Sequence, residues 1–291
     1  MLYDVQHRTT LSYEETVSIS HHVLHLEPRS WLRQSQLWFE LHVDPAPSQQ
    51  STSMDFFGNH VHHFTMQEPH QQLIVETRSR VDVQPQESPA APSNSPPWEA
   101  ILSMLAAADA SVMEPMRFAF TSPYVFWDRE ARDFALPSFS PGRPILDACM
   151  DLTSRIFSEF EYQGGVSDVS TPVRQVLKMR KGVCQDFAHL QIACLRSLGL
   201  ATRYISGYLL THPPPGQPKL VGSDASHAWI SVWAGELGWI DFDPTNNLMP
   251  NDEHITIGWG RDYGDVSPMN GFIIGGGAHS VAVAVDVAAA A

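Results

Sequence analysis

In the run Gly182-Val183-Cys184-Gln185-Asp186-Phe187-Ala188-His189-Leu190, a cysteine stands directly before a long segment with a helical pattern. Residues 185–198 contain neither Gly nor Pro, and their apolar side chains cover most of the helix surface, which predicts a buried helix that stops at Gly199. Such a helix holds Cys184 at its N-terminus, where unpaired N–H groups and the positive end of the dipole favour a thiolate. The pattern therefore predicts a nucleophile, with an inert buried cysteine as the alternative.

The composition limits the class of protein. The chain has 291 residues, of which 43% are hydrophobic, so it is long enough for one large globular domain or two ordinary ones. Its 32 acidic and 18 basic residues give a formal net charge of −14, which argues against nucleic acid or an anionic membrane as the main partner. The three cysteines include no C-x-x-C pair. We therefore expect no disulfide framework and a cytoplasmic location. We also expect no signal peptide and no membrane span.

Two regions of the chain differ in their periodicity. Residues 1–84 alternate apolar and polar side chains in several segments, which predicts an N-terminal antiparallel sheet or sandwich. Residues 85–97 contain five prolines and are predicted to form a linker. Residues 98–291 are predicted to form an α+β domain with its core at about 143–250. Within it, helices are expected at 98–110, 144–160 and 173–180, strands at 202–210, 227–233, 239–243 and 279–287, and a loop at 212–226.

The strands 227–233 and 239–243 make a predicted hairpin that places two polar residues together. If residue 233 pairs with 237, His227 lies directly opposite Asp243; if 233 pairs with 239, the two are diagonal neighbours. Both registers put the two side chains on the same side of the sheet. The sequence therefore predicts an oriented His–Asp pair, whereas the position of Cys184 beside it depends on tertiary structure.

These segments resemble the transglutaminase-like cysteine proteins, in particular the bacterial members that have an N-terminal β region. The segments that carry the resemblance are Gly182–His189, Arg196–Tyr208, Ser226–Trp229, Gly238–Asn246, Gly260–Pro268 and the Gly58-Asn59 turn. One departure is Ala201, where the family commonly has proline. The resemblance implies an α+β fold with a papain-like core, in which helices pack on an antiparallel sheet, preceded by an N-terminal antiparallel β domain.

The resemblance also implies acyl-transfer chemistry. Cys184 would attack the carbonyl carbon of a peptide or carboxamide to give a thioester, His227 would carry the proton, and Asp243 would orient His227. The backbone N–H of Cys184 and a second donor would bind the oxyanion, and Gln185 is a weak candidate for that donor. Trp229 could line the substrate cleft, although core packing is its default. We expect hydrolysis of a peptide or protein amide, with transfer to an amine as the alternative.

No metal or other cofactor is expected, because the chain lacks a D-x-D-x-D-G calcium loop. A different class of function would be metal binding in the N-terminal region, which is rich in histidine. The histidines concerned are His60, His62 and His63, with His21, His22 and His25. A non-catalytic scaffold that kept the fold is a further alternative.

Several polar residues compete for roles near the predicted site. Asp241 shares a strand face with Asp243 and could be the orienting carboxylate instead. Asp186 and His189 could support the nucleophile or could be structural. The remaining cysteines, Cys149 and Cys194, are expected to be packing residues.

Overall fold

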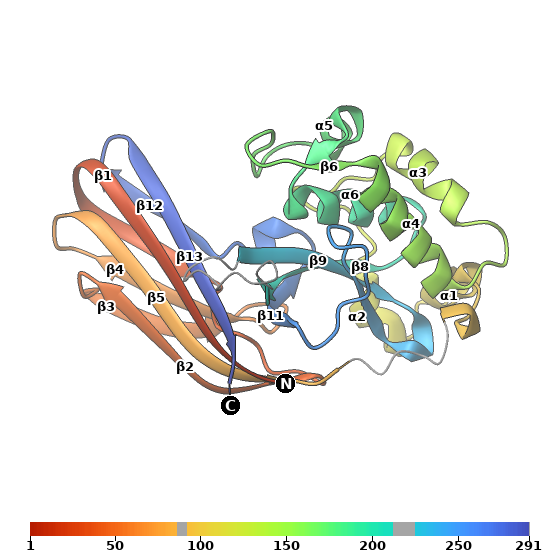
Figure 1. Ribbon diagram of the computed structural model, residues 1–291, viewed down its shortest axis with the longest axis horizontal. Helices are drawn as coiled ribbons and strands as arrows, with labels where there is room; N and C mark the ends of the chain where they lie inside the picture. Colours follow the sequence, from red (N-terminus) through yellow and green to blue (C-terminus); the bar gives the residue numbers. More distant parts are fainter. Residues whose placement is uncertain (86–91, 212–224, 291) are drawn as a thin grey trace, which may run out of the picture.

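The computed structural model describes residues 1–85, 92–211 and 225–290, and it has an α+β fold. A seven-stranded antiparallel sheet forms one part of the molecule, and a helical part with a four-stranded sheet forms the other (Figure 1). The predicted loop at 212–226 lies outside the described residues except for its last two positions, and so do residues 86–91 of the predicted linker. Within the described ranges, no helix combines the length and the apolarity needed to cross a bilayer.

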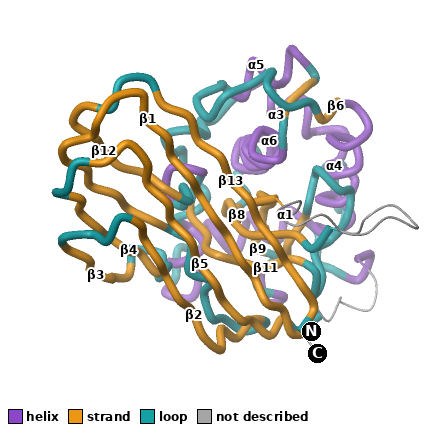
Figure 2. The backbone as a smooth tube through the Cα atoms, turned by 60° about the vertical axis from the view of Figure 1, so that its left-hand side comes forward, coloured by secondary structure: helices purple, strands orange, loops and turns teal. Residues whose placement is uncertain are grey.

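The seven-stranded sheet is built around its longest strand, β1. Along its first half, β1 lies between β5 and β13; along its second half, it lies between β4 and β12 (Figure 2). Alternate residues of β1 such as Tyr3, Val5 and His7 are buried, as the predicted alternation requires. The strands of this sheet are β1 (Leu2–Leu24), β2 (Gln34–Asp44), β3 (Gln49–Met54), β4 (His60–Met66), β5 (His70–Val83), β12 (Met269–Gly275) and β13 (His279–Ala289).

The C-terminal strands correct the predicted domain division. Residues 98–291 were all expected in the second domain, but β12 and β13 both pair with β1, and Tyr3 is the partner of Ala289. Figure 2 shows β13 alongside β1, with the two chain ends at one corner. Val285 and Val287 are buried whereas Val281 and Val283 are exposed. The alternation in this segment indicates a strand but does not identify its partner, which long-range packing decides.

The second part has a sheet in the order β10-β9-β8-β11 and helices packed on it. Its strands are β6 (Glu161–Tyr162), β7 (Lys181–Gly182), β8 (Thr202–Leu209), β9 (Ala225–Trp233), β10 (Trp239–Phe242) and β11 (His254–Gly260). Its helices are α1 (Trp98–Ala106), α2 (Met113–Met116), α3 (Arg129–Ala135), α4 (Ile145–Glu159), α5 (Val173–Met179) and α6 (Cys184–Ser197). Short 3₁₀ turns occur at Pro92–Asn94, Ala110–Val112, Leu136–Ser138, Gly235–Leu237 and Tyr263–Asp265.

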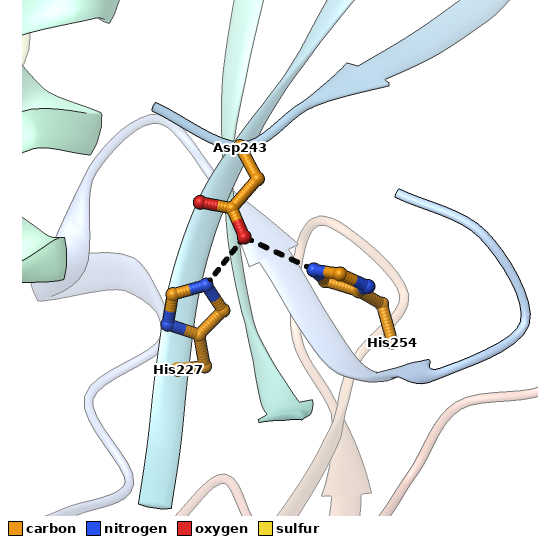
Figure 3. Close-up of side chains that lie close together, drawn as sticks. All are labelled: His227, Asp243 and His254. Atoms are coloured by element: carbon orange, nitrogen blue, oxygen red, sulfur yellow. Dashed lines mark hydrogen bonds and ion pairs between the residues drawn. The ribbon is translucent and has the colours of Figure 1, made fainter. Parts of the chain in front are cut away.

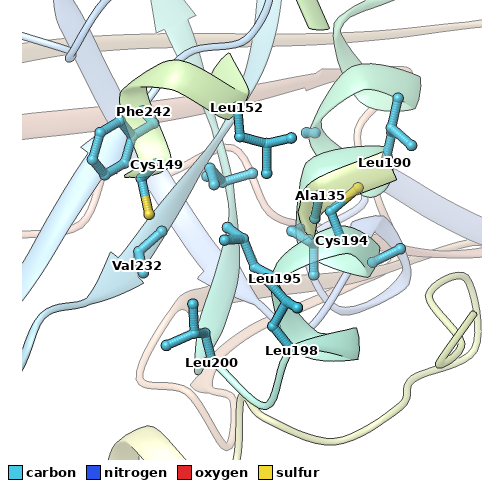
Figure 4. Packing of buried hydrophobic residues seen from close by; sticks show 14 of the residues in the cluster. Ala135, Cys149, Leu152, Leu190, Cys194, Leu195, Leu198, Leu200, Val232 and Phe242 are labelled. Carbon is cyan, nitrogen blue, oxygen red and sulfur yellow. The ribbon is translucent and has the colours of Figure 1, made fainter. Parts of the chain in front are cut away.

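The core of the second part surrounds α6. Leu190, Leu195 and Cys194 of this helix are fully buried and belong to one cluster with Val232 of β9 and Cys149 of α4 (Figure 4). Burial raises the pKa of the Cys149 and Cys194 thiols well above the ordinary value. These two cysteines therefore pack as small apolar side chains, as expected.

The two parts share a core, so they are not independent units joined by a free linker. One cluster combines Tyr3 of β1 and Val285 of β13 with Tyr208 of β8 and Ile255 of β11. The end of the predicted linker is also packed, since the backbone N–H of Leu146 donates to Ser95 Oγ (3.1 Å) at the start of α4. A proline-rich composition indicates an irregular chain but not an unattached one.

Candidate active site

Cys184 is the first residue of α6, as the sequence predicts. The carboxylate of Asp186 accepts hydrogen bonds from the backbone N–H of Val183 (2.8 Å) and from Ser167 Oγ (2.5 Å), which stabilises the helix start. Gly182 is required there, because a Cβ at that position would lie 2.8 Å from the Asp186 side chain. Asp186 therefore has a structural role next to the thiol, and the partly exposed Cys184 is held at the end of a rigid element.

The hairpin of β9 and β10 brings His227 against Asp243. Trp233 pairs with Trp239, so the second of the two predicted registers is correct and the two residues are diagonal neighbours. His227 Nε2 donates to Asp243 Oδ2 at 2.7 Å (Figure 3). Cys184 also lies close enough to His227 to raise the pKa of the imidazole. Because Nε2 faces the carboxylate, Nδ1 is the ring nitrogen left for the sulfur. Tertiary structure thus brings Cys184 near the hydrogen-bonded pair of His227 and Asp243.

Asp243 is fully buried and accepts five hydrogen bonds. Its Oδ1 accepts from the backbone N–H groups of Thr245 (2.9 Å) and Asn246 (3.2 Å). Its Oδ2 accepts from His227, from Asn246 Nδ2 (2.7 Å) and from His254 Nε2 (3.0 Å; Figure 3). These donors fix the carboxylate in place, which in turn fixes the orientation of the imidazole.

Neither His254 nor Asn246 is predicted from the sequence to take part in the site. Asn246 comes three residues after Asp243, so a local Asx-type turn could have indicated it. His254 comes from β11, and its neighbour across the sheet is β8, so no local pattern relates it to Asp243. We expect it to act as a positioning residue that holds the Asp243 carboxylate.

The pKa values of the His227 ring and the Asp243 carboxylate are shifted in opposite directions. Burial alone would lower the pKa of His227, but the hydrogen bonds and charge of Asp243, together with Cys184, outweigh it and raise this pKa to about 10. Burial would raise the pKa of Asp243, but hydrogen bonds from His227, His254 and Asn246 hold it far below the ordinary range. Near neutral pH, the site therefore contains a cationic imidazole against an anionic carboxylate.

These two pKa shifts predict a pH dependence of stability. The folded-state pKa of His227 lies above its ordinary 6.5, so its contribution to the free energy of unfolding is full below that pH and is lost as the pH rises toward about 10. The contribution of Asp243 is full above its ordinary pKa of 3.8 and is lost on acidification. Urea denaturation of the wild type and His227→Gln measures this effect. The stability difference between them should shrink from neutral to alkaline pH; a constant difference would contradict the assignment.

Asp241 and Trp229 form a second layer beneath the ring. Asp241 Oδ2 accepts from Trp229 Nε1 (3.3 Å) and from Arg33 Nη2 (3.2 Å), so Asp243 and not Asp241 meets the imidazole. Trp229 is 0% exposed and stacks on His227 with ring centroids 5.9 Å apart. The expectation that Trp229 lines the substrate cleft is therefore wrong, because a fully buried indole presents no surface to a ligand.

The other residues near Cys184 are also placed by the structure. Gln185 Nε2 donates to the backbone carbonyl of Val169 at 3.3 Å, which leaves its second amide N–H, so its role as the oxyanion donor stays a prediction. His189 Nε2 accepts from the backbone N–H of Tyr263 at 3.1 Å, which makes it a structural tie between α6 and the segment after β11. Tyr162 is not predicted from the sequence as a site residue. It pairs with Gly182, and burial followed in size by the charge of nearby Cys184 raises the pKa of its phenol.

Gly207 makes room for the layer under His227. It pairs with His227 across β8 and β9, and a Cβ on it would lie 2.2 Å from the Ile255 carbonyl oxygen and 2.4 Å from the Trp229 ring. We expect Gly207→Ala to lower the free energy of unfolding by about 3 kcal/mol and to displace His227. Thermal and urea denaturation measure the loss. Gly164→Ala is the control, since a Cβ there meets nothing within 4 Å, and equal stability of the two variants would contradict the packing.

Two groups of histidines bear on metal binding. The N-terminal histidines are not gathered: His60 and His62 face Glu27, whereas His63 bonds to Ser53 and His21 to Thr65. Among the described residues, the group with ligand atoms close together is His227, Asp243 and His254, all within 4.8 Å. Ligands of tetrahedral zinc lie about 3.3 Å apart. The 2.7 Å contact between His227 and Asp243 is shorter, so this arrangement fits hydrogen bonds better than a metal.

Comparison with known proteins identifies the family of this chain. The family model of the bacterial transglutaminase-like N-terminal region matches residues 3–82, and that of the transglutaminase-like superfamily matches residues 134–244. An uncharacterized protein of Mycobacterium tuberculosis is 43% identical over 98% of this chain and 92% of its own length. An uncharacterized protein of Mycobacterium leprae is 32% identical over 97% of both chains.

A solved structure from Cytophaga hutchinsonii, described as a cysteine-protease candidate, has the same fold. It is 22% identical and superposes with a TM-score of 0.76 over 99% of this chain and 90% of its own. A protein-glutamine gamma-glutamyltransferase of Pseudomonas aeruginosa matches a shorter segment, with 35% identity over 24% of this chain and 11% of that protein. With its cysteine at the start of a core helix and its N-terminal β region, the chain belongs to the transglutaminase-like superfamily, a family of cysteine-dependent acyl-transfer proteins.

Proposed function

We propose that this protein is a cysteine-dependent amide hydrolase in which Cys184, His227 and Asp243 act together. The observation that supports it most directly is the 2.7 Å hydrogen bond between His227 and the buried Asp243, with Cys184 close enough to raise the pKa of His227. A cationic imidazole beside the sulfur stabilises a thiolate, and an anionic carboxylate on the other side stabilises the imidazolium.

The reaction proceeds in two half-reactions. The Cys184 thiolate attacks the carbonyl carbon of an amide, and the oxyanion that forms is met by the backbone N–H of Cys184 at the first turn of α6. The tetrahedral intermediate collapses to a thioester as the C–N bond breaks, and His227 gives its proton to the departing amine. Water then attacks the thioester and loses a proton to His227, and the C–S bond breaks to release the acid and restore the thiolate–imidazolium pair.

Tyr162 is our candidate for a substrate contact near the thiol. It is 59% exposed, whereas Tyr204, whose phenol also interacts electrostatically with Cys184, is buried. Burial and the nearby Cys184 raise the pKa of Tyr162, so its hydroxyl keeps its proton and can donate to a substrate carbonyl.

Mass spectrometry of trapped adducts tests the proposal. The protein is incubated with a library of peptides and carboxamides in ¹⁸O water, with and without a fluorescent primary amine. We expect an acyl adduct on Cys184 and a free acid that carries ¹⁸O. A product that carries the amine would instead indicate transfer, the activity named for the Pseudomonas relative. Absence of any adduct on Cys184, in a protein whose thiol alkylates normally, would favour a non-catalytic scaffold.

A further inference from the structure

A pocket of about 840 Å³ lies at the junction of the two parts of the molecule, and its lining residues do not include Cys184, His227 or Asp243. Its walls come from the segment after β1, from the end of β5, and from β8, β10 and β11. The side chains that carry the argument are Trp31, Arg33, Glu114, Arg203, Trp239 and Trp259. A concave site that combines indoles with a few charged groups has the character of a small-molecule site.

Arg203 is the unusual group in this pocket. It is only 3% exposed, and its guanidinium carbon lies 3.8 Å from the ring centre of Trp259 and 4.4 Å from that of Trp239. Within the described part of the chain, it has no hydrogen-bond or ion-pair partner, and its Nε is a buried donor without an acceptor. A buried charge without a partner is destabilising, and stacking on indoles occupies the guanidinium faces but not its N–H edge.

The neighbouring charged groups are already engaged elsewhere. Arg33 Nη2 donates to Asp241 Oδ2 at 3.2 Å, and Glu114 Oε2 accepts from Trp239 Nε1 at 3.2 Å. Arg29 stacks on Trp259 and donates to Asn59 Oδ1. Burial lowers the pKa of Arg203 to about 9, although Asp241 and Glu114 act in the opposite direction. An acceptor that enters the pocket would therefore find its donors on Arg203.

We propose that this pocket binds a small monoanion with a planar apolar body, of the aromatic carboxylate class. The carboxylate would accept hydrogen bonds from the Arg203 guanidinium, and the ring would pack on the indoles of Trp31 and Trp239, which also line the pocket. A carboxylate suits the pocket better than a phosphate dianion, because the carboxylate of Glu114 at the wall repels a second negative charge.

This pocket is separate from Cys184, His227 and Asp243 but is connected to them. Arg203 pairs with Ser231, which lies four residues from His227 along β9, or roughly 13 Å at the rise of a strand. Asp241 accepts from Arg33 of the pocket and from Trp229, which stacks under His227. No step of the proposed hydrolysis uses Arg203, so the pocket is a binding site in addition to the proposed function.

Isothermal titration of the full chain with 2-naphthoate and with its neutral analogue 2-naphthamide tests the proposal. We expect naphthoate to bind at least about tenfold more tightly, as for a hydrogen bond to a charged group. Binding by the wild type alone decides this comparison: equal affinity for the two compounds would overturn the proposal. Inorganic phosphate should not compete, and effective competition by phosphate would overturn the role of the planar body.

Variants then locate the ligand. Arg203→Met, which keeps a long apolar side chain, should weaken naphthoate binding about tenfold or more, whereas Arg78→Met on the exposed face of β5 should leave it unchanged. Melting temperatures confirm that both variants are folded. Cys184→Ala should bind naphthoate like the wild type. Loss of binding in Cys184→Ala, or full binding in Arg203→Met, would overturn the assignment to this pocket.

Discussion

Cys184→Ala abolishes turnover, with kcat expected to fall at least about 10³-fold, because no other thiol can reach the substrate carbonyl. The fold should survive, since Asp186 and not the thiol caps the start of α6. The rate of ¹⁸O-labelled acid formation, with the adduct-forming peptides as substrates, measures the loss. The melting temperature of the variant shows whether its fold is retained.

Cys194→Ala is the matched control for this experiment. It removes an equally small thiol from the same helix, but from a position that is 0% exposed in the core. We therefore expect it to lower the free energy of unfolding by about 1 to 3 kcal/mol while kcat per folded molecule is kept. Turnover in Cys184→Ala at the wild-type rate would remove the proposed mechanism.

The second large effect is expected from Asp243→Asn. This change keeps the size of the side chain but removes the charge that His227 and His254 face, so we expect kcat to fall about 10² to 10⁴-fold with partial activity left. Stability should also fall, by about 3 kcal/mol, because the buried imidazolium loses its counter-charge. Steady-state rates and urea denaturation measure the two losses.

Asp241→Asn is the control for Asp243→Asn. It tests whether the loss of turnover comes from the contact of Asp243 with His227 or from the loss of any buried charge. Asp241 is as deeply buried and lies two residues away on the same strand face, but it contacts Trp229 and Arg33 instead of the imidazole. We expect the pH profile of turnover to shift downward in Asp243→Asn, since Asp243 is what raises the pKa of His227, and to stay in place in Asp241→Asn. A downward shift of similar size in both variants would argue against Asp243 as the orienting residue.

The centre of the site could be predicted because its geometry follows from local rules. A run without Gly or Pro after Cys184 is sufficient to predict α6 and the position of the thiol at its start. His227 and Asp243 could be placed together because both possible registers of the short hairpin put the two side chains on the same face of the sheet. The register itself was left open, and the pairing of Trp233 with Trp239 settled it.

The supporting residues could not be predicted, because they depend on contacts between distant segments. His254 reaches Asp243 from β11, which is placed by its pairing with β8. Trp229 appeared able to line a cleft, since alternation on β9 shows which face a side chain shares but not what covers that face. Gly207 lies opposite His227, and because it has no side chain it leaves room for the Trp229 indole. This close approach is visible only in the folded chain.

The pairing of the first strand with the last has a consequence for synthesis. Tyr3 leaves the ribosome 286 residues before its partner Ala289, which at about 5 to 20 residues per second is a delay of roughly 15 to 60 s. Throughout this interval, β1 has an unpaired edge that would otherwise form hydrogen bonds with β13. The nascent chain must therefore keep that edge from pairing with another molecule until β13 has been synthesised, and a chain released before β13 is made would carry the same open edge permanently.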